Sequence, residues 1–175
     1  MSNPQNHVFI LMGVSGSGKS AVASAVAHEA DAAMLDGDYL HPRANINKMA
    51  AGHALDDNDR APWLAALNDA IFAMQRTNPV SLLVCSALKK SYRDRLREGN
   101  RNLHFLYLKG DKTVIEERLK QRKGHFFKPQ MLVTQFAALE QPGADENDVM
   151  AIDINQPLDG VVADTLACIN RITAR

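Results

Sequence analysis

The sequence has little cysteine, no excess of either charge and no long apolar run. Its two cysteines, Cys85 and Cys168, are too few for a disulfide scaffold and lack Cys-x-x-Cys metal spacing. The 20 Lys and Arg residues balance 20 Asp and Glu residues, which argues against a nucleic-acid partner because duplex binding needs a large basic surface. No apolar run approaches the roughly 18 residues of a bilayer span, and residues 1–7 lack the features of a signal peptide. We therefore expect a cytoplasmic protein with no membrane partner.

Short apolar runs alternate with amphipathic stretches along the whole chain. The length predicts one domain spanning residues 1–175. Strands are expected near residues 8–12, 34–35, 80–85, 103–108 and 149–154. Strands that alternate with helices predict an α/β fold with a parallel sheet flanked by helices on both faces. Two polar intervals, about 39–62 and about 120–142, interrupt this order, and we expect them to be a substrate-binding insertion and a lid.

One segment matches the phosphate-binding pattern G-x-x-x-x-G-K-[ST] in full, between an expected strand and an expected helix. It consists of Gly13, Val14, Ser15, Gly16, Ser17, Gly18, Lys19 and Ser20. The glycines allow a turn whose N–H groups converge on phosphate oxygens at a helix N-terminus. Lys19 is expected to act catalytically by placing a positive charge on the β and γ phosphates, and Ser20 to ligate Mg²⁺. The segment therefore predicts a protein that binds a nucleoside triphosphate.

A pair of acids separates the classes of nucleotide-binding protein. The Asn-Lys-x-Asp guanine motif of GTPases is missing, and the apolar run at residues 82–86 ends without the acid of a motor ATPase. Asp36 and Asp38 instead follow the second expected strand. One carboxylate can face the metal while the other accepts a proton from a substrate hydroxyl, as phosphoryl transfer requires. This favours a small-molecule kinase, and a nucleotide-dependent binding module without acceptor chemistry stays open as the alternative.

Other polar residues have competing interpretations. Arg118 and Arg122 lie four residues apart on an expected helix, where they either neutralise the transferring phosphoryl group or form a solvated helix end. The six histidines show no metal-binding spacing. Asp56, Asp57 and Asp59 are expected to cap the helix that carries Trp63, and the spacing of Trp63 favours core packing. Cys85 lies in an apolar run and is expected to be a buried thiol.

Several further segments, taken with the phosphate loop, resemble the gluconokinase family of the thermoresistant type. They are Asp36-Gly37-Asp38-Tyr39-Leu40-His41-Pro42, residues 45–49, Asp59-Arg60-Ala61-Pro62-Trp63-Leu64, Cys85-Ser86-Ala87-Leu88-Lys89, Tyr92-Arg93-Asp94, Gly124-His125-Phe126 and Gln135-Phe136. The likeness runs in order from about residue 8 to about residue 160. It implies ATP-dependent phosphorylation of D-gluconate at its 6-hydroxyl, giving ADP and 6-phospho-D-gluconate for the pentose phosphate and Entner–Doudoroff routes. It also implies a homodimer and the three-layer P-loop kinase fold of nucleoside-monophosphate and shikimate kinases, with five parallel strands.

The resemblance also implies roles for individual residues. Asp36 becomes the metal-side acid and Asp38 the acceptor of the 6-hydroxyl proton. The gluconate carboxylate needs a cation, preferably a bidentate arginine. The candidates for that contact are Arg60, Arg43, His41 and Lys89, and adenine is expected against Arg118 or Arg122 and against Gln156 and Pro157. A kinase of the same fold acting on shikimate or a nucleoside monophosphate is the second enzyme hypothesis.

Overall fold

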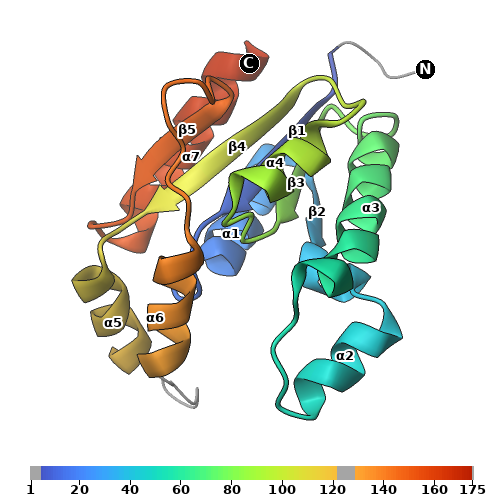
Figure 1. The fold of residues 1–175 in the computed structure, drawn as a ribbon. Helices are drawn as coiled ribbons and strands as arrows, with labels where there is room; N and C mark the ends of the chain where they lie inside the picture. Colours follow the sequence, from blue (N-terminus) through green and yellow to red (C-terminus); the bar gives the residue numbers. More distant parts are fainter. Residues whose placement is uncertain (1–4, 122–128, 175) are drawn as a thin grey trace.

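A parallel sheet forms the centre of the protein. The computed structural model describes residues 5–121 and 129–174. Its strands are β1 (His7–Met12), β2 (Ala33–Asp36), β3 (Val80–Val84), β4 (Leu103–Lys109) and β5 (Val149–Asp153). They form one five-stranded sheet in the order β2-β3-β1-β4-β5, and every pairing is parallel (Figure 1). The expected α/β fold with a five-stranded parallel sheet is confirmed.

Helices cover both faces of this sheet. They are α1 (Lys19–Ala30), α2 (Arg43–Ala50), α3 (Asp57–Met74), α4 (Lys90–Arg97), α5 (Lys112–Gln121), α6 (Pro129–Ala138) and α7 (Leu158–Thr173), with a short 3₁₀ helix, η1 (Gly37–Leu40). Helices α1 and α7 pack on one face, and α3 and α4 pack on the other. Helices α2, α5 and α6 extend beyond the carboxyl ends of the strands, with α2 on one side of the molecule and α5 and α6 on the other (Figure 1). Among the described helices, none is both long and apolar enough to cross a membrane.

Strand β1 shows why the sequence forms three layers. Phe9 and Leu11 belong to the core shared with α1 and α7, whereas Val8, Ile10 and Met12 belong to the core shared with α3 and α4. All of these side chains are fully buried. A strand covered on both faces has no polar side to present, which explains the uninterrupted apolar run. This burial fixes the strand that leads into the phosphate loop.

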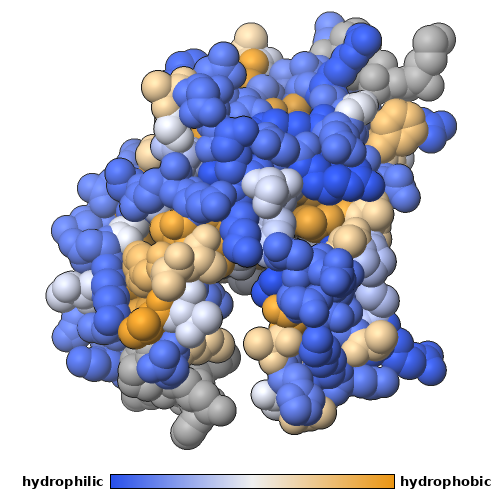
Figure 2. Space-filling view, in the orientation of Figure 1, coloured by the Kyte–Doolittle hydropathy of each residue, from blue (hydrophilic) through white to orange (hydrophobic). Residues whose placement is uncertain are grey.

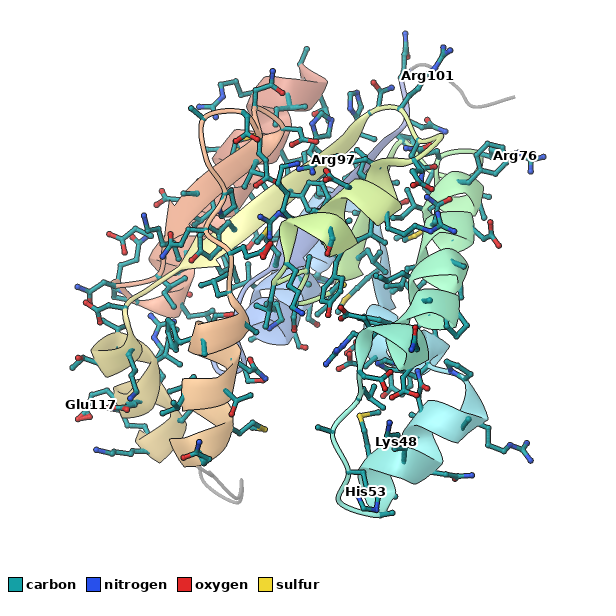
Figure 3. All side chains as sticks on the ribbon, in the orientation of Figure 1. Lys48, His53, Arg76, Arg97, Arg101 and Glu117 are labelled. Atoms are coloured by element: carbon teal, nitrogen blue, oxygen red, sulfur yellow. The ribbon has the colours of Figure 1, made fainter. Side chains whose placement is uncertain are left out.

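Helix α3 begins before the region that its apolar periodicity predicts. Asp56 is its N-cap: the Asp59 N–H donates to the Asp56 carboxylate at 2.8 Å, and the Asp56 N–H donates to the Asp59 carboxylate at 2.9 Å. Lys48, labelled in Figure 3, donates to Asp59 at 2.5 Å and ties α2 to this cap. The expected capping role is thus confirmed, and the cap is worth about 1 kcal/mol.

The structure describes the first of the two polar intervals completely and the second only in part. The interval at about 39–62 contains the end of η1, the whole of α2 and the first residues of α3. The interval at about 120–142 contains α6, but its residues 122–128 lie outside the described residues. The insertion and lid assigned to these intervals therefore stay predictions.

A histidine pair at the amino end of the sheet predicts acid sensitivity. His104 Nε2 lies 3.0 Å from His7 Nδ1, and its ring stacks on Phe9 at 4.9 Å. Burial, reinforced by His7, lowers the pKa of His104 to about 4. The unfolded chain therefore binds more protons than the folded one between that value and the ordinary value of about 6.5, so stability falls as the pH falls through this window. We expect a loss of about 2 kcal/mol between about pH 7 and about pH 5 from this residue.

Urea denaturation of the protein and of His104→Phe at both pH values measures this contribution. The variant retains an aromatic ring but cannot titrate, so its pH-dependent loss should be smaller by about 2 kcal/mol. His28→Gln, at an exposed position on α1, should behave as the unmodified protein does. Equal pH dependence in His104→Phe and the unmodified protein would refute the assignment.

Candidate active site

The phosphate loop joins β1 to α1 and has the backbone that its glycines allow. Gly16 has a φ of 84°, and a Cβ there would meet the Leu119 side chain at 2.7 Å, so only glycine fits. The Lys19 ammonium donates to the carbonyl oxygens of Gly13 and Val14 at 2.8 and 3.0 Å. The lysine is therefore held over the loop, at the N-terminus of α1.

Two features of this loop fit a phosphate ligand. Burial lowers the pKa of Lys19 to about 8, even though Cys85, Asp38 and Asp36 favour the charged form. An anion beside the ammonium would restore that form. Among the described residues, the buried Ser17 hydroxyl has no hydrogen-bond partner. A buried donor without a partner costs about 1–3 kcal/mol, and a phosphate oxygen is the acceptor that such a loop binds.

Two adjoining cavities lie at the carboxyl ends of the strands, and the phosphate loop lines the first of them. The first has a volume of about 200 Å³ and is lined by Ser15, Gly16, Gly18, Lys19, Ser20, Asp38, Val84, Cys85 and Ser86. The second, of about 400 Å³, lies between residues of α2 and α3 on one side and α6 on the other. The space-filling view is hollowed between these two sides of the molecule (Figure 2). Asp38 and Ser86 line both cavities, so they mark the junction between them.

The acid pair is built on a tight turn after β2. Asp36 ends the strand and its carboxylate accepts a hydrogen bond from the Asp38 N–H at 3.0 Å. A Cβ at Gly37 would approach the Val84 carbonyl to 2.7 Å, so the turn requires glycine. The Trp63 indole N–H donates to the Gly37 carbonyl at 2.9 Å and fixes the turn from α3. Asp38 thereby projects into the cavity junction, whereas Asp36 is not among the lining residues of either cavity.

Burial raises the pKa of two groups that line the phosphate-loop cavity, Asp38 and Cys85. Burial, assisted by the charge of Asp36, raises the pKa of Asp38, and His41 and Lys19 oppose that shift. A carboxyl with a raised pKa is a stronger proton acceptor when it is ionised. Burial raises the pKa of Cys85 to about 12, which confirms the expected buried, inert thiol.

The candidates for the substrate carboxylate do not all reach the second cavity. Arg60, Lys89 and His41 line it, whereas Arg43 is exposed at the start of α2 and is not a lining residue. His41 stacks on Trp63 at 4.3 Å, and burial lowers its pKa. A histidine that stays neutral is a poor partner for an anion. Trp63 is 7% exposed, which confirms the expected core packing.

Arg60 and Lys89 belong to a cluster that the sequence did not predict. We name Asp57, Arg60, Lys89 and Tyr92 the cation cluster. The Tyr92 hydroxyl donates to Asp57 at 2.6 Å and accepts from Arg60 at 3.2 Å, and the Lys89 ammonium lies 3.5 Å from Asp57. The Arg60 and Lys89 charges also lie 5.7 and 5.5 Å from the Tyr92 ring centroid. Tyr92, together with Asp57, raises the pKa of Lys89, so this ammonium stays charged near neutral pH.

The residues expected near adenine come together in part. Arg118, at the end of α5, donates to the carbonyl oxygens of Ile154 and Gln156, the latter at 2.7 Å. Pro157 is the N-cap of α7. Arg122 lies outside the described residues. The structure therefore joins α5 to the loop after β5, and the adenine contact stays a prediction.

A phosphate loop after the central strand, with a carboxylate at the junction of two adjoining cavities, defines a P-loop kinase. A family model described as an AAA domain matches residues 8–141. The chain is 70% identical over 170 residues to the thermoresistant gluconokinase of Escherichia coli (strain K12), and the match covers 97% of each chain. A crystal structure of a gluconokinase from Sinorhizobium meliloti 1021 is 40% identical, with a TM-score of 0.85 over 98% of this chain and 96% of that chain.

The chain belongs to the gluconokinase family. A more distant likeness bears on the fold alone. Shikimate kinase from Aquifex aeolicus is 15% identical, with a TM-score of 0.57 over 94% of this chain and 96% of that chain. The expected likeness to shikimate kinases is thus confirmed at the level of the fold.

Proposed function

We propose that the protein transfers the γ-phosphoryl group of ATP to the 6-hydroxyl of D-gluconate. The observation that carries this proposal is the position of Asp38, which lines both the phosphate-loop cavity and the cavity lined by Arg60, Lys89 and Tyr92 of the cation cluster. A nucleotide in the first cavity and a sugar acid in the second would meet at this carboxylate. Family membership supports the choice of gluconate over shikimate or a nucleoside monophosphate.

The reaction needs one proton acceptor and charge neutralisation. The 6-hydroxyl oxygen forms a bond to the γ phosphorus, the bond from that phosphorus to the β–γ bridging oxygen breaks, and ADP leaves. Asp38 accepts the hydroxyl proton, and Lys19 neutralises charge on the β and γ phosphates. Because such a transition state needs little covalent help, holding the two substrates in line is the main task of the protein.

Two oxygen ligands suit a magnesium ion in this arrangement. Ser20 lines the phosphate-loop cavity, and Asp36 lies at the end of β2. A hydroxyl and a carboxylate are hard donors, and Mg²⁺ in kinases typically keeps one or two such protein ligands beside phosphates and water. We propose that these residues hold the ion, which when bound neutralises phosphate charge.

The cation cluster offers a site for the gluconate carboxylate. Arg60 is a planar donor suited to bidentate contact, and Lys89 adds a second charge. Asp57 and Tyr92 hold both cations together. We propose that these two cations bind the carboxylate end of the substrate, while Asp38 contacts its other end.

The cytoplasmic location and the homodimer stay predictions of the sequence.

Removing the carboxylate contact should weaken acceptor binding selectively. Arg60→Met is expected to raise the KM for D-gluconate by about 10- to 100-fold, the value of a lost charge-assisted hydrogen bond. ADP release with Mg-ATP and D-gluconate, D-glucitol, shikimate or AMP measures this. D-glucitol replaces the carboxylate with a hydroxymethyl group, so it should be a poor acceptor for the unmodified protein and be affected little by the substitution.

Arg76→Met is the matched control, since Arg76 is an exposed arginine at the far end of the α3 region (Figure 3). Its KM for gluconate should be unchanged. Stimulation of ADP release by AMP or shikimate but not by gluconate would refute the proposed substrate. Equal losses with gluconate and glucitol in Arg60→Met would refute the assigned carboxylate contact.

A further inference from the structure

Gln135 joins helix α6 directly to the phosphate loop. The Ser15 backbone N–H donates to the Gln135 side-chain oxygen at 2.6 Å, and the Gln135 side-chain nitrogen donates to the Ser15 hydroxyl at 2.7 Å. The two bonds use both ends of the amide, so they also fix its orientation. They connect residues that are 120 positions apart in the sequence.

Ser15 lies in the phosphate loop and lines its cavity, where backbone N–H groups bind the phosphate oxygens of a nucleotide. In this structure its acceptor is a neutral amide oxygen. That oxygen takes the hydrogen bond that a phosphate oxygen would otherwise accept. A nucleotide phosphate that accepts from the Ser15 N–H would therefore have to displace the Gln135 oxygen.

The same glutamine also lines the second cavity, of about 400 Å³, which we call the acceptor cavity because it would hold the sugar acid. Gln135 borders that cavity together with Met131 and Thr134 of α6, opposite the cation cluster. The chain after α6 is anchored beside Lys89, because the Glu140 N–H donates to the Leu88 carbonyl and the Glu140 carboxylate accepts from the Lys90 N–H, both at 2.8 Å. Gln135 thus lies between the two cavities on a helix whose end is fixed.

We infer that Gln135 is a positioning residue that couples the two substrates. A nucleotide phosphate takes the Ser15 N–H, the amide turns toward the acceptor cavity, and there it binds hydroxyl groups of the polyhydroxy acid. An amide supplies both donors and an acceptor for such groups. The step in which Gln135 binds the polyhydroxy acid is the acceptor half of this inference, and it rests on the proposed function. The step in which a nucleotide phosphate takes the Ser15 N–H is the nucleotide half, and it requires only that the loop binds phosphate.

The nucleotide half is tested without any acceptor. Calorimetry with Mg²⁺ and the non-hydrolysable β,γ-imido analogue of ATP gives Kd for the unmodified protein and for Gln135→Ala, Gln135→Asn, Gln135→Glu and Gln130→Ala. Removing the competing acceptor in Gln135→Ala should tighten binding by about 3- to 10-fold. Gln135→Asn is too short to span the contact and should behave likewise. Gln135→Glu keeps the acceptor but adds a negative charge beside the phosphates, so it should weaken binding by about 10-fold or more.

A residue that served only to anchor α6 would not give a lower Kd in Gln135→Ala and a higher Kd in Gln135→Glu. Gln130→Ala, at an exposed position on the same helix, should leave Kd unchanged. Shifts of the same sign in Gln135→Ala and Gln135→Glu, or no shift in either, would overturn the inference. Because the Gln135 side chain is only partly buried, the variants should fold, and far-ultraviolet circular dichroism checks this.

The acceptor half is tested by measuring Kd for D-gluconate with and without the ATP analogue. The unmodified protein should bind gluconate about 5-fold more tightly when the analogue is present, and the analogue should gain the same factor from gluconate. In Gln135→Ala this coupling should fall to within about twofold. Coupling that survives the substitution would overturn this half. A failure of gluconate to bind at all would count against the proposed substrate and leave the nucleotide result standing.

Discussion

Asp38→Asn should lower kcat for gluconate phosphorylation by about 100-fold or more, which is the usual cost of a lost proton acceptor. The amide is nearly the same size as the carboxyl, so the turn held by Trp63 and Gly37 should persist. Nucleotide binding should not weaken, because the substitution removes a negative charge from the lining of the phosphate-loop cavity and the proton transfer that it abolishes occurs only in the transition state. Single-turnover phosphate transfer and calorimetry with the ATP analogue measure the two quantities separately.

The pH profile provides a second readout of the same substitution. Asp38 must be ionised to accept a proton, so kcat/KM for gluconate should fall as the pH falls through the pKa that Asp38 has in the free protein. Burial and the charge of Asp36 raise that pKa, so the acid limb should lie above the pH at which a free carboxyl titrates. Asp38→Asn should lack this limb.

Asp69→Asn is the matched control for Asp38→Asn, because Asp69 is an exposed carboxylate on α3. Its kcat and pH profile should match those of the unmodified protein. Full activity in Asp38→Asn would remove this residue from the mechanism. An acid limb that persists there would assign it to another group.

The features that were predictable from the sequence depend on neighbours along the chain. The phosphate loop is specified by glycines and a lysine within one turn, and each strand is specified by its own apolar run. The turn at Gly37 is predictable in the same way, because Asp36 and Asp38 directly precede and follow it. Local chemistry of this kind needs no knowledge of what packs above it.

The contacts that were missed join distant segments. Asp57 was expected only as a helix cap, yet its carboxylate accepts from Tyr92, which lies 35 positions later. Gln135 and Ser15 are further apart still. Such pairs follow from how α3, α4 and α6 pack around the strand ends, and apolar periodicity does not specify the packing of polar faces. Tyr92 and Gln135 both lie in segments that carry the family resemblance, and that was the signal available for them.

Helix α4 shows the same limit most clearly. Its residues, Lys90–Arg97, are mostly charged and suggest a solvated helix. Arg93 is nevertheless completely buried. Its guanidinium donates to Glu146 at 2.7 and 2.8 Å and to the carbonyl oxygens of Ala87, Leu88 and Glu140 at 2.8, 3.2 and 2.9 Å. The charge therefore links the loop that carries Lys89 to the segment that follows α6.

Glu146→Leu should consequently destabilise the protein by about 3–5 kcal/mol, because it leaves the Arg93 charge buried without its counter-ion. Arg97, labelled in Figure 3, donates to the same carboxylate at 2.8 Å and loses a partner as well. Urea denaturation near neutral pH measures the change. Glu98→Gln is the control: Glu98 pairs with Arg95 at 3.0 Å on the exposed surface, and such a pair contributes at most about 1 kcal/mol.

Lowering the pH should reproduce this loss of stability in the unmodified protein. The hydrogen bonds from Arg93 lower the pKa of Glu146 to about 2, so its contribution is present above the ordinary carboxyl value and is lost as the pH falls from about 4.5 toward that pKa. Glu146→Leu should lack this part of the acid dependence. Combining it with Arg93→Met removes the unpaired charge and should recover part of the stability. A loss below about 1 kcal/mol in Glu146→Leu would contradict the argument, and no recovery in the double variant would assign the loss to packing instead of charge.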